Sequence, residues 1–148
     1  PPNEWNSDGG YNIHVRMLNC IILTQSCDLE NKKVEIVLVC PFYNLEDFIE
    51  RQPESSRRGK GRDNLIRSLK QGHLPAYHLL NKGESVGVND FIVVDFRNVY
   101  GVHINFLENY IAHQESMVRL MPPYREHFSQ AFARYFMRVG LPIGIEIN

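Results

Sequence analysis

Residues 20–31, Cys-Ile-Ile-Leu-Thr-Gln-Ser-Cys-Asp-Leu-Glu-Asn, decide the fold expected for this chain. The apolar run at their start predicts a buried strand over residues 20–26, and a second β-branched run predicts another over residues 34–40. The polar residues between the two runs are typical of a hairpin turn. The thiol of Cys27 and the carboxylate of Asp28 follow the first strand. Because a core strand fixes its backbone while the next turn exposes side chains, we expect reactive groups here.

The composition is that of one globular domain. The chain has 148 residues, of which 43% are hydrophobic and 22% charged, enough to bury a core. A formal net charge of −1 excludes a strong global field that would attract nucleic acid or a membrane. The charge is uneven, however, because residues 51–70 hold seven of the 16 Lys and Arg residues against two acids, Glu54 and Asp63. A local basic segment is therefore expected.

The cysteine count and the hydropathy indicate the compartment. Three cysteines is an odd number, and free thiols are common in apolar strands, so we expect a reducing, cytoplasmic setting without disulfides. No apolar run approaches the roughly 20 residues of a membrane span, and no signal peptide is visible. The chain opens with Pro1-Pro2 instead of Met, which favours a piece of a longer protein. No cofactor is indicated.

The remaining elements follow from periodicity and from turn residues. We expect a flexible lead-in over residues 1–12 and a single domain over residues 13–148. Pro41 should stop the second strand, Asp63 should cap a helix, and Gly72 should end it. The other expected elements are a strand at 13–18, helical turns at 45–51, a basic loop at 51–63, a helix at 64–71, an edge strand at 74–80, strands at 91–96 and 99–103, a helix at 106–112 and an amphipathic C-terminal helix at 123–139.

This order of elements predicts an α+β fold. The architecture that we favour is a small SH3-like β-barrel with an inserted loop-helix and a C-terminal amphipathic helix.

Cys27 is the first candidate for chemistry. A thiol reacts as the thiolate, and the neighbouring Asp28 would raise its pKa, so a histidine such as His78 must converge on it from elsewhere. A zinc site built from Cys27, His73 and His78 is disfavoured, because an offset of five residues on a strand places the two histidines on opposite faces. The alternative is that Cys27 is a small structural residue and that Asp28 caps the turn.

Asp95 and Arg97 close the third apolar strand. Strand alternation directs both side chains to one face and Phe96 to the other. Arg97, oriented by Asp95, is a candidate ligand for a phosphate. The alternative is a structural ion pair that closes the strand end.

The basic loop is the second candidate for phosphate contact. Arginines form bidentate contacts with phosphates, and glycines let backbone N–H groups approach. No strand precedes this loop and no Gly-Lys-Ser/Thr sequence ends it, so it is not a Walker motif. The residues proposed to bind phosphate are Arg57, Arg58, Lys60 and Arg62. A solvated charged loop is the alternative.

Two parts of the chain resemble the MazF/PemK-like toxin family. Cys20–Asp28 and Val37–Tyr43 are similar to its central hairpin, and Ser85–Arg97 with Phe106-Leu107 is similar to its later strand and short helix. The resemblance covers residues 18–45 and 85–112, and it implies an SH3-like barrel, usually dimeric, that cuts single-stranded RNA without a metal. The family's usual catalytic positions are not matched, because Arg16-Met17 replaces an Arg-Pro and Phe42-Tyr43-Asn44 lacks a Thr or Ser. Strings such as Thr24–Leu29 otherwise look like a small prokaryotic family.

These observations lead to one main hypothesis and one alternative. We expect a domain that contacts single-stranded RNA or another nucleic acid, related to toxins or to phage defence. If it cleaves RNA, it acts as a metal-independent endoribonuclease with a His or Asp base and an Arg that stabilises the transition state. The candidate catalytic residues are Cys27, Asp28, His78, Asp95 and Arg97. The alternative is a non-catalytic module that binds a protein partner or a second copy of itself.

Overall fold

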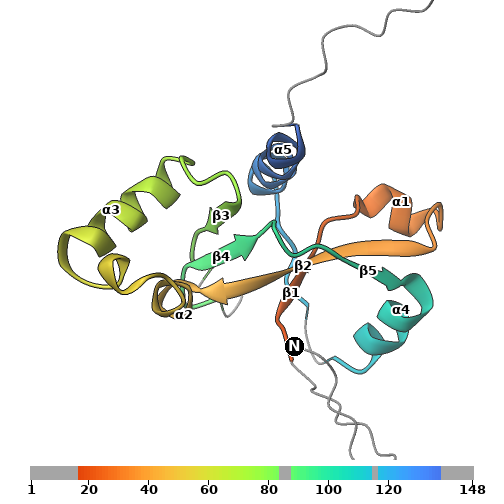
Figure 1. Ribbon diagram of the computed structural model, residues 1–148. Helices are drawn as coiled ribbons and strands as arrows, with labels where there is room; N and C mark the ends of the chain where they lie inside the picture. The colour runs from red at the N-terminus through yellow and green to blue at the C-terminus, as the bar shows by residue number, and fades with distance from the viewer. Residues whose placement is uncertain (1–16, 84–87, 115–116, 138–148) are drawn as a thin grey trace, which may run out of the picture.

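The computed structural model of the protein describes residues 17–83, 88–114 and 117–137. Strands and helices are mixed along the chain, and the expected α+β class is confirmed (Figure 1). The elements are β1 (Cys20–Ile22), α1 (Ser26–Glu30), β2 (Ile36–Asn44), α2 (Leu45–Glu50), the 3-10 helix η1 (Glu54–Ser56), α3 (Gly59–Lys70), β3 (Tyr77–Leu80), β4 (Ile92–Asp95), β5 (Tyr100–His103), α4 (Ile104–Ala112) and α5 (Tyr124–Phe136).

The strands form one antiparallel sheet around β2. The order is β1-β2-β4-β3, and β5 also pairs with β2. Val39 pairs with Ile22 of β1 and with Tyr100 of β5, so these two strands lie on opposite edges of β2. Within the described ranges no pairing closes the sheet, so it is an open sheet and no closed barrel is formed there.

β2 runs through Pro41 to Asn44, so the prediction that this proline stops the strand is wrong. Phe42 N–H donates to Asn19 C=O at 2.9 Å on the β1 edge. Because consecutive residues of a strand direct their backbone groups to opposite edges, the position of Pro41 faces the other edge. A proline has no N–H to donate there, and the strand tolerates it by losing one ladder bond.

The segment that pairs with this edge of β2 separates from it beside Pro41. β4 pairs with β2 as far as Val94 opposite Phe42, and β5 begins at Tyr100 opposite Val39. Residues 95–99 therefore lie opposite only the two residues of β2 between Val39 and Phe42. The extra residues form a bulge in the strand pairing, next to Pro41. This bulge carries the polar side chains of the candidate site.

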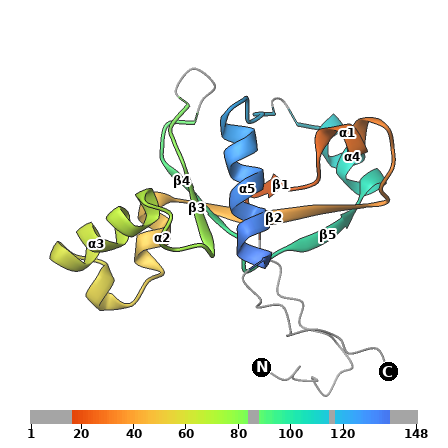
Figure 2. The same ribbon diagram turned by 90° about the horizontal axis from the view of Figure 1, so that it is seen from above.

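The two faces of the sheet pack against different helices. Val93 packs with Phe48 of α2 and Leu69 of α3 on one face. Val94 points the other way and packs with Phe128 of α5. Figure 2 shows α5 standing across the sheet, with α2 and α3 near one end of β2 and α1 and α4 near the other.

The segment predicted as a basic loop at 51–63 is instead mostly helical. After η1, α3 begins at Gly59, earlier than the predicted cap at Asp63. Gly72 follows the end of α3 with a φ of +68°, a conformation that suits glycine, so the predicted stop is confirmed.

Most other predicted elements are confirmed. The two strands of the first hairpin pair antiparallel, although residues 26–30 form the short helix α1 instead of a strand end and turn. β3 lies at a sheet edge, and the strands predicted at 91–96 and 99–103 correspond to β4 and β5. The expected helical segments correspond to α2, α4 and α5. The lead-in at 1–12 and most of the strand at 13–18 lie outside the described residues. None of the described helices has the length and apolarity needed to cross a membrane.

Candidate anion-binding site

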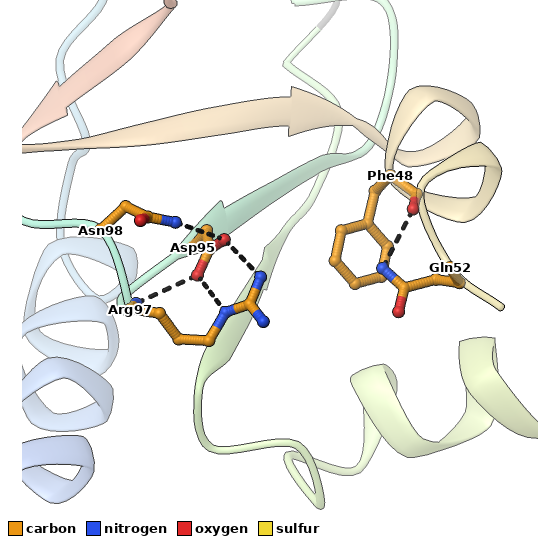
Figure 3. Close-up of polar contacts among 5 residues, drawn as sticks. All are labelled: Phe48, Gln52, Asp95, Arg97 and Asn98. Carbon is orange, nitrogen blue, oxygen red and sulfur yellow. Dashed lines mark hydrogen bonds and ion pairs between the residues drawn. The ribbon is translucent and has the colours of Figure 1, made fainter. Parts of the chain in front are cut away.

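Asp95 is the buried polar residue at the centre of the site. It ends β4 and is only 2% exposed. Its Oδ1 accepts hydrogen bonds from the backbone N–H of Arg97 at 3.0 Å and from Arg97 Nε at 2.9 Å. Its Oδ2 accepts from Arg97 Nη2 at 2.9 Å and from Asn98 Nδ2 at 3.1 Å (Figure 3). Both carboxylate oxygens thus accept hydrogen bonds from residues of the 95–99 bulge. A buried carboxylate requires such partners to offset the loss of water.

Arg97 is the exposed half of this pair. Its side chain is 54% exposed, against 3% for Asp95. Asp95 fixes the Nε and Nη2 edge of the guanidinium, and the central carbon lies 4.8 Å from the centroid of the Tyr77 ring. The hydrogen bonds to Asp95 raise the pKa of Arg97 further above its ordinary value, so the cation persists at all working pH values. Within the described part of the chain no partner holds Nη1, which leaves a rigid donor for an anion.

A second arginine faces the same cleft. Arg51, which follows α2, places its central carbon 4.3 Å from the centroid of the Tyr43 ring. A cleft of about 440 Å³ lies between α2 and the bulge. Its lining residues include Tyr43, Arg51, Gln52, Tyr77, Arg97 and Asn98. Two arginines, each stacked on a tyrosine, therefore face one mostly polar cleft, an arrangement suited to a phosphate or a carboxylate.

Tyr77 forms the wall between the cleft and the core. It is the β3 partner of Asp95 in the sheet register, and its ring makes an edge contact with Phe48 at a centroid separation of 4.8 Å. Burial raises the pKa of Tyr77, although the Arg97 charge opposes that shift. The phenol therefore stays protonated near neutral pH and can donate a hydrogen bond.

The four basic residues predicted to bind phosphate are used in different ways. Arg57 is half-buried, and its Nε donates to Gln52 C=O at 2.7 Å. Arg62 pairs with Glu46 at 2.5 Å and links α3 to α2. Arg58 and Lys60 are exposed at the start of α3. Two of the four cations are thus engaged in intramolecular contacts, and none of the four is among the residues that line the cleft.

The structure does not bring Cys27 and Asp28 to this cleft. Both belong to α1, which lies toward the end of β2 away from α2 (Figures 1 and 2). The exposed thiol of Cys27 lies 3.8 Å from Asp28 Oδ1 and 3.6 Å from Gln25 Oε1, with no histidine among its hydrogen-bond partners. The expected convergence of this thiol with His78 is therefore absent from the described structure.

His78 points to the opposite face of the sheet from Asp95. It pairs with Val94 in the register, and its ring packs against Phe128 of α5 at 5.6 Å and against Phe96 at 6.3 Å. Burial, helped by the neighbouring charge of His127, lowers the pKa of His78. His78 is thus a neutral aromatic element of the α5 interface, and it cannot serve as a base in the Asp95 cleft.

The arrangement of the cleft favours binding over acid–base chemistry. Both oxygens of Asp95 accept hydrogen bonds, burial raises the pKa of Tyr77, and the hydrogen bonds to Asp95 raise the pKa of Arg97. In the three ranges that the structure describes, no group of His, Cys, Asp or Glu side chains is arranged to hold a metal ion.

Sequence reasoning found Asp95 and Arg97 but missed their surroundings. Tyr43, Tyr77 and Arg51 reach the cleft only because β2, β4 and β3 are neighbours in the sheet. The sequence signal that could have pointed to the cleft is Pro41, since a proline inside a sheet is confined to edges, strand starts and bulges.

Comparisons of the chain with protein-family models, with curated proteins and with solved structures gave no match.

Proposed function

We propose that this chain is a nucleic-acid-binding domain that holds phosphates of single-stranded RNA in the cleft between α2 and the 95–99 bulge. The observation that carries the proposal is the fixed guanidinium of Arg97, held by two hydrogen bonds to buried Asp95 and stacked on Tyr77. A guanidinium fixed in this way loses little conformational entropy when a phosphate binds, and it presents a directional donor.

The surroundings of Arg97 support a polymeric ligand over a free anion. Arg51 adds a second cation to the lining of the cleft, and Arg58 and Lys60 at the start of α3 are exposed. A phosphate backbone needs several cations along its path, together with aromatic side chains beside it. The chain has a net charge of only −1, so the excess of basic residues in this segment is not a consequence of a basic chain as a whole.

Binding, and not cleavage, is the activity that we propose. A metal-independent ribonuclease needs a base close to the 2′-hydroxyl, and the described cleft offers no carboxylate or imidazole in a free state. The relation to SH3-like barrels and MazF/PemK-like toxins, the cytoplasmic location and a homodimer all stay predictions.

The test is titration of the protein into labelled single-stranded RNA and DNA oligonucleotides at low salt, with the strands then checked for length. Wild type should bind RNA and leave it intact, and Arg51→Ala should weaken binding about tenfold through loss of one phosphate contact. Arg134→Ala, at an exposed position on α5, is the matched control and should bind like wild type. Shortened strands would restore the nuclease hypothesis. Absence of binding would overturn the proposal and favour the protein-interaction module.

A further inference from the structure

A second cleft lies directly beyond Tyr77. It has a volume of about 430 Å³ and lies between the end of α3 and the sheet edge formed by β3. Its lining residues include Leu69, Lys70, Tyr77, His78, Asn81 and Phe91. Its volume falls within the range of about 300–1,000 Å³ that small-ligand sites occupy.

Tyr77 lines both clefts and is their common wall. A ligand phosphate held by Arg97 on one side of Tyr77 is therefore adjacent to whatever occupies the other side. A nucleotide could fill both clefts, because its charged phosphate and its flat, largely apolar base are joined through a sugar. The two clefts differ in the same sense. The first is lined by two arginines, and the second includes the apolar residues Leu69, Leu79 and Phe91 beside Lys70 and Asn81.

Phe91 is an aromatic side chain without a role in the described core. It precedes β4, it belongs to neither of the two core clusters, and its aromatic contact in the described part of the chain is with Lys82 Nζ at 5.5 Å. Its backbone C=O accepts a hydrogen bond from Leu45 N–H, so the fold uses the main chain of this residue and leaves the ring beside the cleft.

Asn81 supplies a polar group of defined orientation at the same cleft. Its Oδ1 accepts a hydrogen bond from the backbone N–H of Lys82 at 2.9 Å. This contact leaves Nδ2 without a described partner, as a donor for a base edge. Lys70, in the last turn of α3, adds a positive charge.

We infer that this second cleft is a nucleobase subsite, and that it takes the base attached to the phosphate bound by Arg97. The inference rests on the proposed function. Phe91 contributes a stacking surface and Asn81 contributes a hydrogen-bond donor, so the base adds affinity beyond that of the phosphates.

The test compares two ligands, a short 5′-phosphorylated RNA and an abasic oligomer with the same number of phosphates. Wild type should bind the RNA at least about tenfold more tightly than the abasic oligomer, as expected when a base stacks on an aromatic side chain. Phe91→Ala should bring this ratio close to one while the affinity for the abasic oligomer is retained. Asn81→Ala, at an exposed position, should lower the ratio without a risk to folding, and Asn109→Ala on α4 is the matched control.

The outcomes separate the two proposals. A ratio near one in wild type, or a ratio unchanged by Phe91→Ala and Asn81→Ala, overturns the base subsite. The proposed phosphate cleft is still supported in that case if Arg51→Ala lowers the affinity for both ligands equally. Failure of wild type to bind either oligomer overturns both proposals.

Discussion

The carboxylate of Asp95 and the guanidinium of Arg97 are joined by two hydrogen bonds of 2.9 Å, with only Phe96 between them in sequence. The pair is unequal, because the Asp95 side chain is 3% exposed and that of Arg97 is 54% exposed. Asp95 is therefore the fixed partner, and Arg97 is the group that it presents to solvent. This asymmetry distinguishes the pair from an ordinary surface salt bridge, in which both groups move freely.

Asp95→Asn should both destabilise the fold and weaken ligand binding. The amide cannot accept at both of its polar atoms, so the charge-assisted bonds to Arg97 and Asn98 are disrupted. We expect a loss of about 2 kcal/mol in the free energy of unfolding, measured in urea. RNA affinity should fall about tenfold at a temperature where the variant is folded.

Glu126→Gln is the control for Asp95→Asn. This residue forms an exposed carboxylate–arginine pair with Arg125 on α5, at 2.7 Å. It should leave the free energy of unfolding close to that of wild type, because exposed ion pairs contribute little to stability. An equal effect of the two variants would show that Asp95 has no special part in the fold.

Gly61→Ala should destabilise the start of α3. A Cβ atom at this position would lie 1.8 Å from the backbone oxygen of Ser55, closer than any real contact. The backbone of η1 would have to move, and we expect a cost of about 2–3 kcal/mol in urea unfolding. Lys60→Ala, one residue earlier and exposed, should change stability by less than about 0.5 kcal/mol. Unchanged stability of Gly61→Ala would mean that the backbone of Ser55 does not lie this close to Gly61.

The three free cysteines should differ in reactivity. Burial raises the pKa of Cys40 to about 12, and the thiol lies in the core at 0% exposure. Cys20 and Cys27 are exposed. Partial burial raises the pKa of Cys20, so this thiol should react more slowly than an unhindered one. Iodoacetamide at pH 8 should therefore modify at most two thiols in the native protein and three in urea, counted by mass spectrometry. Cys27→Ser should remove one native adduct and leave RNA binding unchanged, and a loss of binding would return Cys27 to the functional site.

Stability should depend on pH through His78. Burial against Phe96 and Phe128 lowers its pKa in the folded state below the ordinary 6.5, so the unfolded state binds the proton more tightly. The free energy of unfolding should thus be highest above pH 6.5 and should fall as the pH drops from there toward the lower folded-state pKa. Urea unfolding between pH 5 and 7.5 measures this.

His78→Phe should flatten this part of the pH profile, since a phenyl ring replaces the imidazole among the same aromatic neighbours. His73→Gln, at an exposed position outside this aromatic cluster, should keep the profile of wild type. If the pH dependence of stability is unchanged in His78→Phe, other titratable groups cause it.

The sequence predicted those parts of the fold that depend on local pattern. The apolar runs of β2 and β4, the turn at Gly72 and the aromatic stripe of α5 are each visible in a short window. The strand alternation also predicted that Asp95 and Arg97 share a face, and the hydrogen bonds between them confirm it.

The remaining features depend on contacts between distant segments. The residues before Asp63 were expected to form a loop because residues 52–62 include no apolar side chain. Their helix instead depends on tertiary packing, because Gly61 approaches the backbone of Ser55 so closely that a Cβ atom would not fit. The cleft could not be predicted for the same reason, since the strand order β2-β4-β3 brings its tyrosines together and the bulge opposite Pro41 presents its arginine.

The dependence of RNA affinity on salt tests the phosphate cleft most directly. For wild type, the logarithm of the affinity should fall linearly with the logarithm of salt concentration, by about 0.7 per phosphate contact. Arg51→Ala should reduce this slope by about 0.7. Arg97→Lys should keep the slope but lose about tenfold in affinity, because lysine retains the charge but lacks the planar guanidinium that Asp95 holds in place. Arg134→Ala should reproduce wild type in both slope and affinity. Equal slopes and affinities for all four proteins, or no binding at low salt, would contradict the assignment of Arg97 and Arg51 to phosphate binding.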